Sequence, residues 1–191
     1  ANSGYAHLTA GIDQHFQTNF DDFEYVVCPS GSCTLHANEH ITTKTKVFEL
    51  SAFIHDILKV TDFSHINFPY TIGFHSSCHG LRGLKLAKTD ELVGIPYDKT
   101  KKLLESVQEI AFGSLQYPNE CCGFGGTFAV NEEALSIKMG KDRIADHQTQ
   151  DVDIICGNDM SCLMHLEGIL KRQHTKIKVM HVAEILNGSA K

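Results

Sequence analysis

The sequence predicts an α/β protein with mostly parallel sheets flanked by helices. Short apolar runs of strand length alternate with segments of helical periodicity along the chain. Residues 23–36 and 152–165 repeat the same order of strand, cysteine, turn, Ser-Cys-x-x-His and helix. The chain is therefore expected to consist of two pseudo-repeated α/β halves. Cysteines stand at strand C-terminal ends and helix N-termini, which meet at the carboxyl edge of a parallel sheet.

The first half is predicted to contain three helices and one strand. Residues 4–19 carry apolar side chains at helical spacing, and residues 23–27 form a β-prone run that ends in a Pro- and Gly-containing turn. A helix is expected from Cys33 to about residue 43, with Ser32 as its cap, and another over residues 49–60.

The second half is predicted to hold the remaining strands and helices. Residues 62–69 resemble a loop, and residues 70–75 form a strand that runs into Ser-Ser-Cys-His-Gly. The other expected elements are helices over 81–86, 98–105, 131–148, 161–172 and 182–186, and strands over 108–112, 151–156 and 177–181.

The repeat also predicts how the chain is divided. The second copy contains Cys78 after a strand and the adjacent pair Cys121-Cys122, whereas the first copy has neither. We therefore expect residues 67–191 to be a complete half-domain and residues 1–66 to be the remnant of another. The strand and double-cysteine loop of that first half would lie before Ala1.

Composition disfavours several classes of partner. The chain has 191 residues, 42% of them hydrophobic, a net charge of −6 and no Lys/Arg-rich run, so nucleic acid and anionic membranes are not expected as partners. No apolar stretch approaches the roughly 20 residues of an integral membrane segment. There is also no secretory signal, so the sequence predicts a cytoplasmic protein.

Seven cysteines, at positions 28, 33, 78, 121, 122, 156 and 162, are more than a cytoplasmic fold needs. In a reducing compartment they are expected to be ligands or redox groups rather than disulfides. Adjacent cysteines form a disulfide only with strain, but both thiolates of Cys121-Cys122 can reach one metal cluster. The glycines that follow would let the backbone approach a bulky inorganic group.

The candidate ligands are Cys78, Cys121, Cys122 and Cys162. Four thiolates suit either an iron–sulfur cluster or zinc, and the ligand type alone does not decide between them. The Cys-x2-Cys pairs of structural zinc sites are absent, and the long separations favour a larger cluster. A zinc-stabilised interaction module and direct thiol–disulfide chemistry at Cys121-Cys122 stay open as alternatives. Cys28 and Cys156 are either core residues or a further thiolate.

Several histidines accompany these cysteines. Cys33/His36 and Cys162/His165 each place two side chains on one helical face. His36 and His165 could hydrogen-bond to a cluster, capture zinc or simply lie on a helix surface. His75 and His79 flank Cys78 and are similar candidates, although histidines in such positions are more often solvated loop residues than ligands.

At these positions the chain resembles the cysteine-rich CCG-domain family of iron–sulfur oxidoreductases. The resemblance rests on ECCGFGGTFAV (120–130), MGKD (139–142), GNDMSCLMH (157–165), VMHVAE (179–184), SCHGLR (77–82) and CPSGSC (28–33). Family members carry two units, each with a Cys, a Cys-Cys-Gly and a closing cysteine motif. Cys78, Cys121, Cys122 and Cys162 match the second unit, and Cys33 matches the closing cysteine of the first.

The resemblance implies a [4Fe–4S]-type cluster as cofactor, with zinc as a possible replacement. The ligand set could also include Cys156 and His165. It implies an electron-transfer subunit in the oxidation of L-lactate to pyruvate rather than a stand-alone catalyst. The implied partners are a ferredoxin-like iron–sulfur subunit and a further subunit of the same complex.

Overall fold

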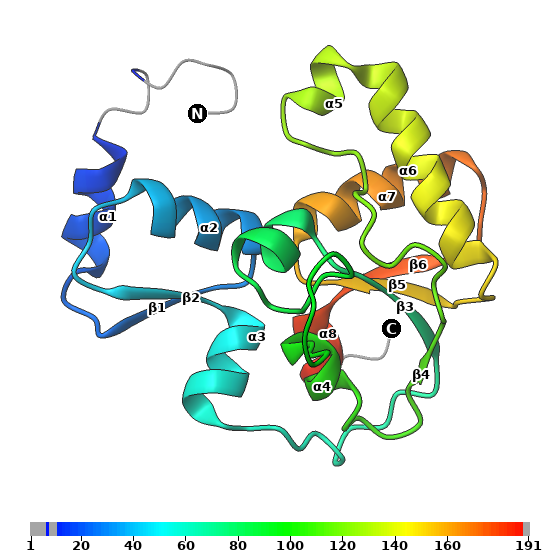
Figure 1. Cartoon of the computed structure of the whole chain (residues 1–191), viewed down its shortest axis with the longest axis horizontal. Helices are drawn as coiled ribbons and strands as arrows, with labels where there is room; N and C mark the ends of the chain where they lie inside the picture. Colours follow the sequence, from blue (N-terminus) through cyan, green and yellow to red (C-terminus); the bar gives the residue numbers. More distant parts are fainter. Residues whose placement is uncertain (1–6, 8–10, 189–191) are drawn as a thin grey trace.

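Two parallel sheets organise the chain (Figure 1). The computed structural model describes residue 7 and residues 11–188. A two-stranded sheet pairs β1 (Tyr25–Cys28) with β2 (Lys46–Glu49). A four-stranded sheet has the order β4-β3-β5-β6, formed by β3 (Thr71–His75), β4 (Ala111–Phe112), β5 (Ile154–Gly157) and β6 (Lys178–His181). All of these pairings are parallel, which confirms the predicted α/β class and fits two halves.

The helices of the first half differ from the prediction at their ends. α1 (Ile12–Phe20) confirms the later part of the helix expected over residues 4–19, whose earlier residues lie mostly outside the described ones. α2 (Gly31–His40) is capped by Ser30, so the expected cap at Ser32 is wrong by two residues. The helix expected over residues 49–60 is a short α3 (Leu50–Ala52) that continues as a π-helix, η2 (Phe53–Leu58).

Strand β2 was not predicted, although the repeat contains a signal for it. Lys46-Val47-Phe48-Glu49 followed by α3 has the same layout as β6, Lys178-Val179-Met180-His181, followed by α8 (Val182–Leu186). In both strands the last residue is the N-cap of the next helix, and its side chain accepts a backbone N–H of that helix. The internal repeat therefore extends through β2 and α3.

The second half contains most of the expected helices with shifted boundaries. They are η3 (His79–Gly83, a π-helix), α4 (Lys99–Leu104), α5 (Phe128–Asn131), α6 (Glu133–Gln148), α7 (Met160–Arg172) and α8. The helix expected over residues 131–148 begins at Glu133 and follows the separate short helix α5. Of the strand expected over residues 108–112, only Ala111–Phe112 is regular. Gln108 makes an isolated bridge to Asn67 outside the named strands. Among the described residues no helix is both long and apolar enough to span a membrane.

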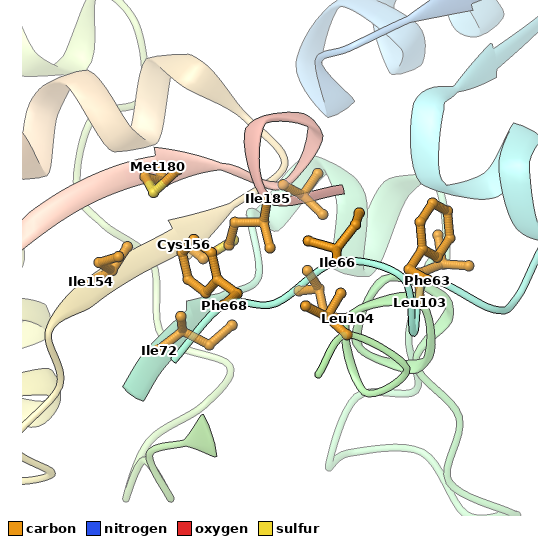
Figure 2. Close-up of a cluster of buried hydrophobic side chains, with 12 residues drawn as sticks. Phe63, Ile66, Phe68, Ile72, Leu103, Leu104, Ile154, Cys156, Met180 and Ile185 are labelled. Atoms are coloured by element: carbon orange, nitrogen blue, oxygen red, sulfur yellow. The ribbon is translucent and has the colours of Figure 1, made fainter. Parts of the chain in front are cut away.

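The four-stranded sheet separates two hydrophobic clusters. Figure 2 shows the first, in which Ile154 and Cys156 of β5 pack with Leu104 of α4 and Ile185 of α8. The second cluster, on the other face, joins Ile155 of β5 to α6 and α7 and includes Cys122 and Cys162. Neighbouring side chains of a strand point to opposite faces, which explains this division along β5. The candidate ligands Cys122 and Cys162 therefore lie on the α6/α7 side.

A buried aspartate joins the two halves. The backbone N–H of Ser32 in α2 donates to the Oδ2 atom of Asp159 at 2.8 Å, while Oδ1 of Asp159 accepts the N–H of Ser161 as the N-cap of α7. α2 also packs on η3, where a Cβ on Gly83 would lie 2.4 Å from a methyl carbon of Leu35. The N-termini of α2 and α7 are thus held together beside η3.

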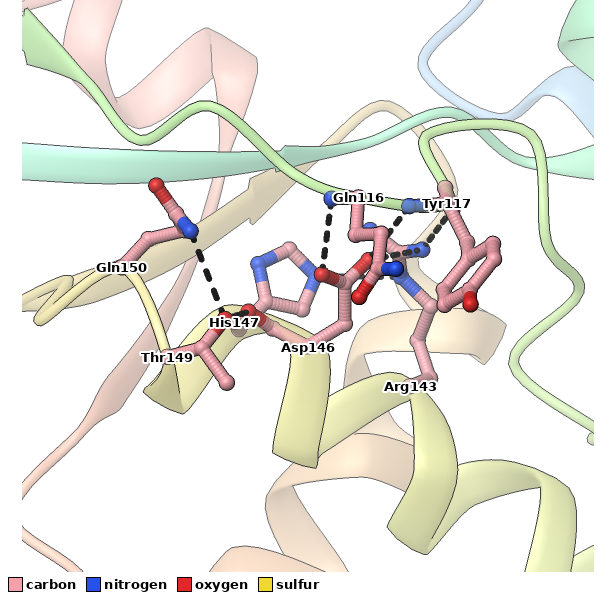
Figure 3. Close-up of polar contacts among 7 residues, drawn as sticks. All are labelled: Gln116, Tyr117, Arg143, Asp146, His147, Thr149 and Gln150. Carbon is pink, nitrogen blue, oxygen red and sulfur yellow. Dashed lines mark hydrogen bonds and ion pairs between the residues drawn. The ribbon is translucent and has the colours of Figure 1, made fainter.

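Three buried side chains of α6 hold the loop that leads to the adjacent cysteines (Figure 3). Asp146 accepts the backbone N–H groups of Gln116 and Tyr117 at 2.9 and 3.0 Å. Arg143 donates to the Tyr117 carbonyl, to Asp146 and to Nε2 of His147. His147 packs on β3, where a Cβ on Gly73 would be 2.1 Å from its Nδ1. We call Arg143, Asp146 and His147 the α6 clamp.

The clamp predicts a large stability difference between two neighbouring aspartates. Asp146→Ala leaves the fully buried Arg143 without its counter-charge and two loop amides without an acceptor, so we expect a loss of about 3–5 kcal/mol in the free energy of unfolding. Asp142→Ala removes only an exposed pair with Lys138 and should cost about 1 kcal/mol or less. Urea unfolding of both variants measures this, and equal losses would contradict the role of the clamp.

Glu49 introduces a pH dependence into the first half. Its side chain is 1% exposed, with Oε2 accepting the Ala52 N–H at 3.0 Å and Oε1 unpaired within the described residues. Burial raises the pKa of this carboxyl to about 7 from 4.5. The folded protein therefore binds a proton that the unfolded chain has already lost across this pH range.

From this we expect the free energy of unfolding to fall as the pH rises from about 4.5 to about 7. Above about pH 7 the carboxyl is ionised in both states, so Glu49 causes no further change. The size of the effect is on the order of 3 kcal/mol, since one pKa unit corresponds to about 1.4 kcal/mol. Glu49→Gln keeps an oxygen for the Ala52 N–H but does not titrate, so its urea-unfolding profile should lack this decline. Parallel pH profiles for the two proteins would contradict the prediction.

Candidate metal centre

The parallel sheet brings two of the four candidate cysteines together. Cys78 lies three residues beyond β3 and directly before η3, and Cys162 is the third residue of α7, which follows β5. β3 and β5 are hydrogen-bonded neighbours whose carboxyl ends align at His75 and Gly157. The segments that leave these two strands therefore start side by side.

The adjacent cysteines complete the arrangement. The sulfurs of Cys122 and Cys162 and a ring nitrogen of His75 all lie within 4.8 Å of one another. Cys121 forms side-chain hydrogen bonds with both Cys122 and Cys78. We call Cys78, Cys121, Cys122 and Cys162 the four-thiol group. All seven cysteines of the chain are free, so no disulfide occupies these sulfurs.

Neighbouring thiols of the four-thiol group have pKa values shifted in opposite directions. Hydrogen bonding with Cys122 and Cys78 lowers the pKa of Cys121, and hydrogen bonding with Cys122 lowers that of Cys162 to about 6. The same contacts raise the pKa values of the donors Cys78 and Cys122. Two thiolates and two thiols can therefore coexist, whereas four thiolates at this spacing need a cation to offset their repulsion. This donor set fits a thiolate-bound metal.

The glycine loop after Cys122 is shaped by α6. Gly123 has φ 86°, and a Cβ there would lie 2.6 Å from the Ser136 carbonyl oxygen and 2.7 Å from Cβ of Met139. Ser136 Oγ donates to the Gly123 carbonyl at 2.7 Å, and the Gly123 N–H donates to the Cys121 sulfur at 3.3 Å. Glycine at position 123 is thus required both by its positive φ and by the close approach of the helix.

His75 is the site residue that the sequence analysis misjudged. The sequence favours a solvated position for it, but it is 1% exposed, and its ring interacts with the Cys162 thiol, whose pKa it lowers. Ile72 and Phe74 pack in the α4/α8 cluster, so the alternation of β3 directs His75 to the face of Cys122 and Cys162. This alternation is the sequence signal that indicates the face of the sheet on which His75 lies. His79 is exposed, as expected.

The remaining candidates lie outside the four-thiol group. Cys156 is fully buried in the opposite cluster, where burial raises its pKa, and this favours its interpretation as a core residue. Cys33 is exposed on α2, and Cys28 is half-buried at the end of β1. His165 packs its ring 6.0 Å from that of Phe124, with Nε2 3.4 Å from the Ser136 carbonyl oxygen, so it supports the glycine loop.

Comparison with known proteins identifies the family. A model of the cysteine-rich domain named CCG matches residues 72–167, a range that contains all of the four-thiol group. The chain is similar to lactate utilization protein A of Exiguobacterium, at 36% identity over 100% of this chain and 80% of that protein. The proteins of the same name from Oceanobacillus iheyensis and Bacillus thuringiensis are 33% and 34% identical over 97% of this chain, and the matches cover 78% and 79% of their lengths.

Similarity at this level over nearly the whole chain is a family relationship, and the match of the domain model agrees with it. The chain belongs to the CCG cysteine-rich domain family, together with the lactate utilization A proteins.

Proposed function

We propose that the chain is an iron–sulfur electron-transfer subunit that serves lactate utilization. The observation that carries this proposal is the four-thiol group, in which sulfurs from three distant segments gather beside the buried His75. His75 already interacts with the Cys162 thiol, so a group bound to that sulfur would lie against its ring. The names of the relatives supply the metabolic context.

Each residue has a defined part in this proposal. Cys78, Cys121, Cys122 and Cys162 would hold a [4Fe–4S]-type cluster, which passes one electron at a time when bound. Cys162 lies in the first turn of α7, whose N-terminal partial positive charge stabilises thiolate there. Arg143 is fully buried and interacts electrostatically with Cys122, so it adds positive charge on the same side. His75 would donate to a sulfur of the site or bind metal.

The wider role follows from the relatives rather than from the site. We propose that the chain works in a cytoplasmic complex that oxidises L-lactate to pyruvate, beside a ferredoxin-like iron–sulfur subunit and a further subunit. Its own part would be to pass electrons, so it would not be a stand-alone catalyst. The proposed half-domain boundary lies near residue 66, with Cys33 as the closing cysteine of the first unit.

A zinc-stabilised interaction module is the second candidate. It is favoured by the compact set of His75, Cys122 and Cys162, whose ligand atoms lie within 4.8 Å of one another and would fill three positions of a tetrahedral zinc site. Cys78 or Cys121 would supply the fourth. The metal content of protein purified without oxygen separates the two candidates.

For protein purified anaerobically from cells we expect iron and acid-labile sulfide in near-equal amounts, at about four of each per chain. Cys162→Ser and Cys78→Ser should each remove most of this iron, because a serine hydroxyl is a poor ligand for the cluster. Iron and sulfide assays with the visible absorption spectrum measure the effect. Stoichiometric zinc without sulfide would favour the interaction module instead.

Cys33→Ser provides the matched control. Cys33 is exposed on α2 and lies outside the four-thiol group, so its replacement should leave the iron content unchanged. If Cys33→Ser removed as much iron as Cys162→Ser, the assignment of the site to the four-thiol group would be wrong.

A further inference from the structure

A large cleft opens on the α4 side of the four-stranded sheet. Its volume is about 910 Å³, near the upper end of the range of about 300–1,000 Å³ that is typical of small-molecule sites. It lies at the carboxyl ends of β3 and β4 and is lined from that side by Phe74, Phe112 and Gly113. A three-carbon acid would fill only a small part of this space.

Two residues of the cleft lie close in sequence to candidate ligands. Leu81 belongs to η3, three residues after Cys78, and Asn119 precedes Cys121 by two residues; both line the cleft. The amide nitrogen of Asn119 is buried and unpaired within the described part of the chain. A donor in this position is available to a ligand.

The lining combines aromatic rings with positive charge. Phe74 and Phe112 are partly buried against the core, and Tyr97 contributes a further ring. The lining also contains four lysines, Lys88, Lys99, Lys101 and Lys102. Rings of this kind stack with a planar aromatic ligand, while ammonium groups bind phosphate or carboxylate.

The lining contains three acidic residues against the four lysines, so its positive excess is small. Asp98 caps α4 by accepting the Lys101 N–H at 2.8 Å, and burial raises its pKa. Asp90 and Glu105 are the other two acidic residues in the lining. Lys99 is paired with Asp56, whereas the exposed side chain of Lys102 makes no hydrogen bond or ion pair within residues 11–188. Lys102 is therefore free to contact an anion.

We propose that this cleft binds a planar aromatic compound that carries a phosphate and has the size of a mononucleotide. The rings of Phe74 and Tyr97 would contact the planar part, and Lys102 would bind the phosphate, while Lys101 lies over the Phe112 ring at 5.3 Å from its centroid. The proposal concerns binding alone and does not depend on the metal. Leu81 and Asn119 connect the cleft with the segments that carry Cys78 and Cys121, and any joint use of the ligand and the proposed cluster rests on the proposed function.

Flavin mononucleotide is a suitable probe, because its ring is planar and its fluorescence reports burial. Titration with metal-free full-length chain should quench this fluorescence saturably, and riboflavin, which lacks the phosphate, should bind more weakly. Lys102→Glu should weaken binding of flavin mononucleotide by at least about fivefold, and Lys102→Arg should restore it. Lys141→Glu makes the same charge change at an exposed position of α6 outside the cleft, so the affinity for flavin mononucleotide should stay unchanged.

Three results would overturn the proposal: no saturable quenching, equal affinity for riboflavin and flavin mononucleotide, or the same affinity in Lys102→Glu and Lys141→Glu. Because Lys102 is exposed, its replacement is not expected to unfold the chain. The titration uses metal-free protein, so its failure leaves the iron and sulfide result untouched. The two proposals can thus fail separately.

Discussion

The parallel pairing of β3 with β5 is the constraint on which the site depends. It aligns His75 with Gly157, so that η3 and α7 leave the sheet next to each other and carry Cys78 and Cys162 to one place. Right-handed crossovers in such a sheet put the intervening helix on one face. Here the face covered by α6 and α7 receives Cys122 and Cys162, while Cys156 lies in the core on the face covered by α4 and α8.

The third segment of the site depends on α6 rather than on the sheet. The α6 clamp fixes residues 116 and 117 through Asp146, and Ser136 fixes Gly123 three turns earlier on the same helix. Cys121 and Cys122 lie between these two anchors. A buried arginine is costly unless it is paired, so the clamp uses its ion pair to hold a loop that has no regular structure of its own.

The sequence was sufficient to predict the α/β class, the parallel sheets and most elements, because strand and helix periodicities are clear in this chain. It did not predict β2, because a run of four residues is too short to be recognised as a strand by itself. Comparison of Lys46–Glu49 with Lys178–His181 would have indicated it. The burial of His75 depends on which face of β3 is covered, and the clamp depends on a contact between residues 26–30 positions apart. The alternation of β3 indicates the face of His75 but not that this face is covered, and the contacts of the clamp have no local sequence signal. The four cysteines were chosen from their spacing and the family resemblance, and their role as cluster ligands stays a prediction.

X-ray absorption at the iron edge of anaerobically purified protein tests the central claim most directly, namely that the four-thiol group binds one iron–sulfur cluster. The account predicts an inner shell made only of sulfur and a second shell that contains iron, with both signals lost in Cys162→Ser. An inner shell of nitrogen and oxygen, or an iron signal that survives in Cys162→Ser, would contradict it.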